Sequence, residues 1–332
     1  MKNLEMEAVK RVASLPYDWS RFNNKVLLIS GGTGFIGSFL IKVLRYRVDC
    51  FGNKIKVVSL SRRGGVSDDY LENLAADVCN PIEYTAPVDF ILHLASNTHP
   101  KQYAEDPIGT ILTNIDGCNN LLRLAVEKKA RFLLASSVEI YGQGTEKPMD
   151  EHYCGYIDCN QARAGYNEAK RTCEALTQSY RQRFGIGAVI VRFARVFGPD
   201  KKKDTKAMSQ FMDKAVLGDE IVMKSHGEQR YSYVYIADAV SALIKVLLDG
   251  IDGEAYNISD DDGRTLREYA EYLATLSDQK VKFEIEDNSA VSKATFALMD
   301  TTKLKDLGWK PLYTVCQGLK ETYIIKRQEN AN

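Results

Sequence analysis

The chain of 332 residues has no excess of either charge, because 44 Lys and Arg residues are balanced by 44 Asp and Glu residues. Nucleic-acid binders usually carry a strong basic excess, so this balance argues against a nucleic-acid partner. Long hydrophobic runs are missing as well. The longest uncharged stretch, residues 26–41, has 16 residues, four of them glycine, and is too short to span a membrane. Residues 1–7 carry two acids and no apolar run, so we expect neither a secretory signal nor a membrane partner.

Paired cysteines and clustered histidines are also scarce. The seven cysteines form an odd number without a CxxC pair, and the four histidines show no metal-ligand spacing. These absences favour reduced thiols and a cytoplasmic location, and they predict no metal site. Apolar residues make up 45% of the chain and charged residues 27%, which is typical of an ordered globular protein.

Strands and helices are predicted to alternate through the first part of the chain. Short apolar runs typical of buried parallel strands lie at 25–30, 55–60, 88–94, 132–135 and 188–193, and a further strand is expected to end near Asp77. Helical patterns at 35–47, 110–128 and 162–184 separate these runs. The alternation predicts an α/β fold with a doubly wound parallel sheet.

The regular alternation of predicted strands and helices changes after residue 196. Helices are expected near 205–216, 237–249, 265–276 and 316–328, with short strands near 220–223, 232–235, 254–258 and 281–285. We therefore predict three regions: an N-terminal extension at 1–22, a first domain at 23–195, and a smaller C-terminal α/β lobe at 196–330 that is partly interleaved with it. Within the extension, residues 4–15 favour a short amphipathic helix that packs as an arm.

Three glycines, Gly31, Gly34 and Gly37, follow the first predicted strand and open the first helix. Glycine allows a tight turn and a close approach of backbone to a pyrophosphate, and the helix N-terminus then offers free N–H groups. This setting predicts a dinucleotide site, completed by Thr33, Phe35 and Ile36. The first domain is thus expected to bind the dinucleotide and the C-terminal lobe to bind the substrate. A plain tight turn is the alternative.

The end of the second predicted strand indicates which dinucleotide binds. An acid there would bind the ribose 2′-hydroxyl, whereas arginine accepts a 2′-phosphate. Residues 58–63 contain Arg62 and Arg63 and no acid. The pattern therefore favours NADP over NAD, with two solvated arginines as the alternative.

Tyr166 and Lys170 lie four residues apart in the predicted helix 162–184, so they share one face. A tyrosine with an unperturbed pKa of about 10 is a poor base at neutral pH, but a neighbouring ammonium favours its phenolate. Tyr166 is then able to take a hydroxyl proton. Ser137, just after the predicted strand 132–135, supplies a hydroxyl that would orient the substrate oxygen.

Together, the glycine turn, Ser137 and the YxxxK pair resemble the extended short-chain dehydrogenases/reductases, the NAD-dependent epimerase/dehydratase family with its Rossmann sheet. The resemblance covers about residues 25–325. It implies that Lys170 holds the nicotinamide ribose and that helices 110–128 and 162–184 form a homodimer interface. It also implies further cofactor contacts at Asp77, Val78, Leu94, Ala95 and Ser96.

Within that family the strongest resemblance is to UDP-glucuronate decarboxylases, on residues 93–96, 107–114, 130–137 and 163–171 together with Glu139. In those enzymes the sugar C4 hydroxyl is oxidised, the C5 carboxylate leaves as CO2, and hydride returns to C4. The resemblance implies a sugar-nucleotide-modifying enzyme in which Glu139 handles protons or orients substrate. A capping or loop carboxylate is the alternative role for Glu139.

The chain departs from the decarboxylase pattern at its substrate side. Where those enzymes place an arginine seven residues before the aspartate matching Asp238, this chain has Tyr231, with Arg230 beside it. The asparagine that touches the diphosphate is replaced by Arg195. We expect Arg195 and Arg230 to bind the diphosphate, with Tyr231 in the same site. Surface ion pairs are the alternative for the arginines.

These departures leave the net reaction open. The acid that 4,6-dehydratases place before Glu139 is Val138 here, which disfavours 4,6-dehydration. A nucleotide-sugar epimerase or a 4-keto reductase is the alternative within the enzyme class. A non-catalytic NADP-sensing protein is the alternative from another class, and the presence of Ser137, Tyr166 and Lys170 argues against it.

Overall fold

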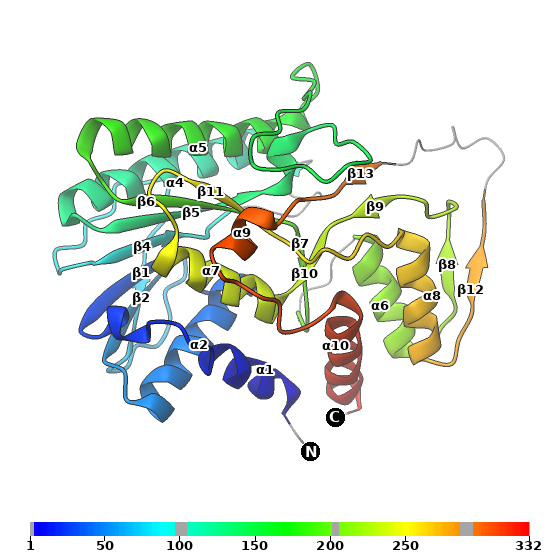
Figure 1. The fold of residues 1–332 in the computed structure, drawn as a ribbon. Coiled ribbons are helices and arrows are strands. Elements are labelled where there is room, and N and C mark those ends of the chain that lie inside the picture. Colours follow the sequence, from blue (N-terminus) through cyan, green and yellow to red (C-terminus); the bar gives the residue numbers. More distant parts are fainter. Residues whose placement is uncertain (1–2, 97–104, 201–205, 286–294, 332) are drawn as a thin grey trace.

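The computed structural model of the chain describes residues 3–96, 105–200, 206–285 and 295–331 (Figure 1). Residues 1–2 of the predicted extension, residues 97–104 of the first domain, and 201–205 and 286–294 of the lobe therefore lie outside the described ranges. The first residue of the helix predicted at 205–216 is among them.

Seven parallel strands form the central sheet, in the order β11-β6-β5-β4-β1-β2-β3. Their bounds are β1 Lys25–Ser30, β2 Ile55–Ser61, β3 Leu71–Ala75, β4 Phe90–His93, β5 Arg131–Ser137, β6 Ala188–Phe193 and β11 Ala255–Ile258. Leu27, Leu28 and Ile29 of β1 are all buried, so both faces of the sheet are covered. The order reverses between β1 and β4, which makes the sheet doubly wound. The predicted fold class is thereby confirmed.

Helices cover both faces of this sheet (Figure 1). One face packs against α4 (Pro107–Lys128) and α5 (Ala164–Phe184). The other packs against α2 (Phe35–Phe51) and α7 (Ile236–Asp249). The apolar positions of α2, α4 and α5 recur at helical spacing, so each of these helices buries one stripe. Helix α7 is buried on nearly every side, because α1 and α2 pack on it as well.

The N-terminal helix α1 (Leu4–Ala13) packs on α2 and α7, and its residues Ala8, Val9 and Val12 are fully buried. It ends earlier than predicted, because Pro16 disfavours helical backbone in the residue before it. A 3-10 turn, η1 (Trp19–Phe22), then leads to β1. The segment thus forms part of the core beneath the sheet.

The C-terminal lobe lies beside the carboxyl edge of the sheet (Figure 1). Its own core is formed by α6 (Ala207–Leu217), α8 (Leu266–Leu276) and α10 (Val315–Asn330). Three short parallel pairs complete it: β8 (Ile221–Met223) with β12 (Val281–Phe283), β9 (Arg230–Tyr231) with β13 (Phe296–Ala297), and β7 (Arg195–Phe197) with β10 (Tyr233–Tyr235). A short helix, α9 (Thr302–Asp306), precedes α10.

The chain returns from the lobe to the central sheet at 236–258, since α7 packs under the sheet and β11 pairs with β6. The strand predicted to end near Asp77 ends at Ala75, and the strand predicted at 88–94 spans only 90–93. The helix predicted to end at Arg47 continues to Phe51, where Gly52 with a φ of 72° ends it. Within the described ranges, every helix is too short or too polar to cross a membrane.

Candidate active site

The turn between β1 and α2 has room only for glycine at two positions. Gly31 has a φ of 75°, and a Cβ there would lie 2.8 Å from the backbone nitrogen of Ala95. A Cβ on Gly37 would collide with the carbonyl oxygen of Gly31 and lie 2.8 Å from Cα of Gly32. At these two positions only glycine lets the turn pack this closely against the backbone of Ala95 and Gly32.

Helix α2 begins at this turn and offers backbone donors to it. Its first residue follows Gly34, which has no side chain that could accept hydrogen bonds from the first turn. The first N–H groups of a helix lack partners inside the helix, so those of α2 are available to an anion. Of the other predicted contacts, Thr33 is exposed, Phe35 and Ile36 are half-buried, and the Phe35 ring lies beside Gly198.

The end of β4 lies directly beside the glycine turn. The backbone N–H of Leu94 donates to the carbonyl of Ser30, and the N–H of Ala95 donates to its hydroxyl. The same hydroxyl lies 2.8 Å from Nδ1 of the buried His93. The structure thus brings the predicted cofactor residues Leu94 and Ala95 to the turn.

Four further predicted cofactor residues follow β2 and β3. Arg62 and Arg63 are exposed and come directly after β2, whose Leu60 carbonyl accepts a hydrogen bond from the N–H of Gly31. Val78 is buried beside α4 at Gly117, and Asp77 is half-buried and accepts a hydrogen bond from the N–H of Cys79. All of these residues lie at the carboxyl edge of the sheet.

Tyr166 and Lys170 are buried in α5, on the face toward β5. The Lys170 ammonium donates to the carbonyl of Ala135 at 2.9 Å and lies 6.0 Å from the centre of the Tyr166 ring. Burial lowers the pKa of Lys170. Burial also raises the pKa of Tyr166 to about 12, against hydrogen bonds with Ser137 and Ser96 that lower it. The tyrosine hydroxyl is therefore held between two serine hydroxyls.

The contact of Ser96 with Tyr166 was not predicted from the sequence, which assigned Ser96 to the cofactor alone. Ser96 Oγ also donates to the side chain of the fully buried Asn114 in α4 at 2.8 Å. The amide of Asn114 in turn donates to the carbonyl of Thr110. The signal available in the sequence was a polar residue inside the apolar stripe of the helix 110–128.

Residues 137–142 contain the predicted catalytic residues Ser137 and Glu139, and we call this segment the catalytic loop after that prediction. It includes the 3-10 turn η2 (Val138–Tyr141). Ser137 Oγ accepts from the N–H of Glu139 at 3.3 Å, and the side chain of Asn167 donates to the Glu139 carbonyl at 2.9 Å. The half-buried Glu139 carboxylate contributes a negative charge that raises the pKa of Tyr166. Ser137, Glu139, Tyr166 and Lys170 thus form one cluster.

The predicted substrate residues Arg195, Arg230 and Tyr231 lie on the short strands β7 and β9, and they do not all point to the same side. The Arg195 guanidinium lies 3.7 Å from the centre of the Tyr231 ring, so these two residues come together. Its Nη1 is buried and has no hydrogen-bond partner among the described residues. Arg230 points the other way and donates to the carbonyl of Gly263 at 3.1 Å, as alternation along a strand requires. Among the described residues there is no group of three or more His, Cys, Asp and Glu side chains that could hold a metal ion.

Residues 27–259 match the NAD dependent epimerase/dehydratase family. The chain belongs to this family. UDP-glucuronic acid decarboxylase 5 of Arabidopsis thaliana is 32% identical, over 90% of this chain and 88% of that protein. UDP-glucuronic acid decarboxylase 1 of Xenopus tropicalis is 29% identical, over 99% of this chain and 78% of that protein.

Solved structures of two epimerases share the fold. The UDP-glucose 4-epimerase of Thermotoga maritima superposes with a TM-score of 0.77 at 22% identity, over 92% of this chain and 99% of that one. The UDP-glucuronic acid 4-epimerase of Bacillus cereus, solved with UDP-glucuronic acid and NAD, gives 0.77 at 20% identity, with the same coverage.

Family membership confirms the family resemblance and the expectation of an enzyme. The family depends on a nicotinamide cofactor. The residues around the glycine turn fit such a group, since the turn has no side chain at Gly31, Gly34 and Gly37 and the first turn of α2 has no side-chain cap. The alternative of a non-catalytic sensor is not favoured, because Ser137, Tyr166 and Lys170 are assembled in the buried cluster.

Proposed function

We propose that the protein is an NADP-preferring enzyme that acts on a UDP-uronic acid by transient oxidation at the sugar C4, followed by loss of the C5 carboxylate as CO2. The class of reaction, modification of a sugar nucleotide, follows from the family and from the decarboxylases that resemble this chain over about nine tenths of its length. The observation that carries the proposal is the position of Ser137, Tyr166 and Lys170, which meet at the carboxyl edge that also bears the glycine turn.

The cofactor, when bound, would accept hydride from the sugar C4 and return it. The glycine turn and the first N–H groups of α2 would hold its pyrophosphate, Asp77 and Val78 its adenine, and Lys170 its nicotinamide ribose. Arg62 and Arg63 extend beyond β2 without an acid beside them and would accept a 2′-phosphate. Their position supports NADP over NAD.

Tyr166 would remove the proton of the C4 hydroxyl. Its pKa of about 12 in the ligand-free protein is set mainly by burial, so the phenolate needs further positive charge beside it. Lys170 supplies one such charge 6.0 Å from the ring. Ser137 would hold the C4 oxygen in line with the phenol. Glu139 would orient the sugar or protonate C5 after CO2 has left.

The diphosphate of the substrate would lie against Arg195, with Tyr231 as a flat surface beside it. The buried Nη1 of Arg195 has no hydrogen-bond partner in the described ranges, and a phosphate oxygen would provide one. Arg230 would reach the same ligand only by leaving the Gly263 carbonyl. The lobe at 196–330 is thus proposed as the substrate lobe, and 23–195 as the cofactor domain with 1–22 as its extension.

We also propose a homodimer through α4 and α5. Ile108 and Leu112, both on α4, are 71% and 49% exposed. Large apolar side chains grouped on one helix face favour burial against a second subunit. Light scattering at micromolar concentration tests this proposal: a dimer is expected, and a monomer contradicts it.

Epimerisation at C4 is the second candidate. It is favoured by Tyr231, which replaces the arginine of the decarboxylase pattern. Incubation with a panel of uridine-, thymidine-, cytidine- and guanosine-diphosphate sugars, with NAD or NADP, separates the candidates when products are identified by NMR. Release of CO2 from a UDP-uronic acid supports decarboxylation, whereas a C4 epimer without CO2 supports epimerisation. The absence of turnover on the whole panel refutes both.

A further inference from the structure

A buried ion pair lies close to the catalytic cluster without belonging to it. Arg192, the fifth residue of β6, binds both carboxylate oxygens of Glu174 in α5, at 3.1 Å and 2.7 Å. The two side chains are only 10% and 13% exposed. Such a forked pair fixes the relative orientation of the two elements that carry it, because both hydrogen bonds must be satisfied together.

The same guanidinium also reaches the catalytic loop. Its Nη1 donates to the hydroxyl of Tyr141 at 3.0 Å and to the carbonyl of Glu151 at 2.7 Å. The Tyr141 hydroxyl donates to the side chain of Asn257 in β11 at 2.6 Å, and the N–H of Asn257 donates to the Glu151 carboxylate. We call Arg192, Glu174, Tyr141, Glu151 and Asn257 the Arg192 network. It joins β6, α5, β11 and the catalytic loop.

The network is attached close to the reacting groups on both sides. Glu174 lies one helical turn after Lys170 in α5, and Tyr141 lies two residues after Glu139 in the loop. Two further bonds join the same helix and loop: Asn167 donates to the Glu139 carbonyl, and Arg171 donates to the Ile140 carbonyl at 2.7 Å.

We infer that Arg192 is a positioning residue for the reaction, which sets the distance between the Ser137–Glu139 segment and the Tyr166–Lys170 face of α5. The inference rests on the proposed function of that cluster. Asn167 and Arg171 hold the loop by its backbone alone. Arg192 also hydrogen-bonds a side chain of the loop, that of Tyr141. Because Arg192 belongs to β6, it ties both the loop and α5 to the sheet. Misplacement of reacting groups by about 1 Å lowers turnover by about a hundredfold.

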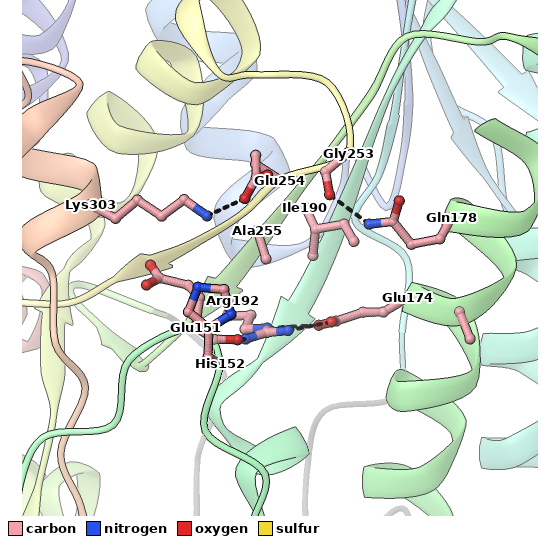
Figure 2. Close-up of a pocket in the computed structure, with 11 residues that line it drawn as sticks. Glu151, His152, Glu174, Gln178, Ile190, Arg192, Gly253, Glu254, Ala255 and Lys303 are labelled. Carbon is pink, nitrogen blue, oxygen red and sulfur yellow. Dashed lines mark hydrogen bonds and ion pairs between the residues drawn. The ribbon is translucent and has the colours of Figure 1, made fainter. Parts of the chain in front are cut away.

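The surroundings of Arg192 make this inference testable by chemical rescue. The guanidinium lies at a cavity of about 300 Å³ (Figure 2), which is also lined by Glu174, Gln178 and Lys303. Two other lining residues, His152 and Ala175, are exposed, so the cavity reaches solvent. Removal of the side chain would enlarge this cavity and leave the Glu174 carboxylate to bind a free guanidinium ion.

The experiment compares Arg192→Ala with Arg131→Ala. Arg131 is a matched control: it is a largely buried arginine of β5, the strand next to β6, and binds the Leu247 and Gly250 carbonyls and Asp252 at the opposite edge of the sheet. We expect kcat of Arg192→Ala to fall by about a hundredfold, with an unchanged dissociation constant for NADP. Millimolar guanidinium should restore turnover, and sodium chloride at equal ionic strength should not. Arg131→Ala should keep kcat and show no rescue.

Hydrogen exchange of peptides covering residues 137–142 gives a second readout that needs no substrate. Faster exchange in Arg192→Ala, but not in Arg131→Ala, supports the inference even if the wild-type chain turns over nothing and the proposed function fails. Equal exchange in both variants overturns the inference. An equal fall of kcat in Arg192→Ala and Arg131→Ala overturns it as well, because it would reflect only a loss of stability that both variants share. If Arg192→Ala does not fold, Arg192→Lys keeps the charge but not the fork, and the same exchange measurement decides.

Discussion

The buried imidazole of His93 predicts a loss of stability in acid whose size follows from the structure. His93 is 1% exposed and its Nδ1 lies 2.8 Å from Ser30 Oγ. Burial, assisted by the nearby charge of Lys170, lowers the pKa of His93 to about 3. An unfolded histidine has a pKa of about 6.5. Between these two pH values the imidazole is protonated in the unfolded chain but neutral in the native protein, so the free energy of unfolding falls as the pH falls.

Between pH 7 and pH 5 this effect lowers the free energy of unfolding by about 2 kcal/mol. The pH falls roughly 1.5 units below the pKa of the unfolded histidine, and each unit counts for about 1.4 kcal/mol.

Asp238 acts in the opposite direction. Burial raises its pKa to about 7, against hydrogen bonds from the N–H groups of Leu312 and Tyr313 that lower it. Its contribution is therefore present at low pH and is lost as the pH rises toward 7, also by about 2 kcal/mol.

Because the two effects oppose one another, they are resolved by comparing single variants. From pH 7 to pH 5, His93→Asn should lose about 2 kcal/mol less stability than the wild type, and Asp238→Asn about 2 kcal/mol more. Urea unfolding of the ligand-free protein measures this through the fluorescence of the buried Trp19 and Trp309. His226→Asn controls for the loss of one exposed imidazole. If His93→Asn has the same pH dependence as the wild type and this control, the reasoning is refuted.

Three further outcomes are expected. Gly37→Ala should raise the dissociation constant for NADP at least tenfold in a fluorescence titration, because the added Cβ would strike the Gly31 carbonyl. Gly263→Ala is the control, since a Cβ there would meet nothing within 4 Å. Arg62→Asp should weaken NADP binding much more than NAD binding, and an equal effect on the binding of both cofactors would refute the preference for NADP. Arg195→Glu should raise KM for the sugar nucleotide, and an unchanged KM would remove this residue from the diphosphate site.

Most of the central sheet was predictable from the sequence, because β1, β4, β5 and β6 contain apolar runs and the helices 110–128 and 162–184 have strong periodicity. Strands β8, β10 and β12 were predicted although each has only three residues, but the short strands β7, β9 and β13 were not. Their pairing is set by contacts within the lobe, as with Arg230 opposite Phe296.

Local spacing found the residues of the site that lie close together in the chain, such as Tyr166 and Lys170. It did not find the contact of Ser96 with Tyr166, or the pairing of Arg192 with Glu174, because these depend on how separate strands and helices meet. The opposite directions of Arg230 and Tyr231 follow from strand alternation, but no strand had been predicted at these residues.

Transient oxidation at C4 is tested most directly with UDP-glucuronic acid that carries deuterium at C4, incubated with the wild-type enzyme and NADP. The account predicts a slower turnover than with the unlabelled sugar, and a product that has lost CO2 and retains deuterium at C4 by NMR. A decarboxylated product formed at the same rate from both substrates, or one whose C4 position has exchanged its deuterium for solvent hydrogen, would contradict the account.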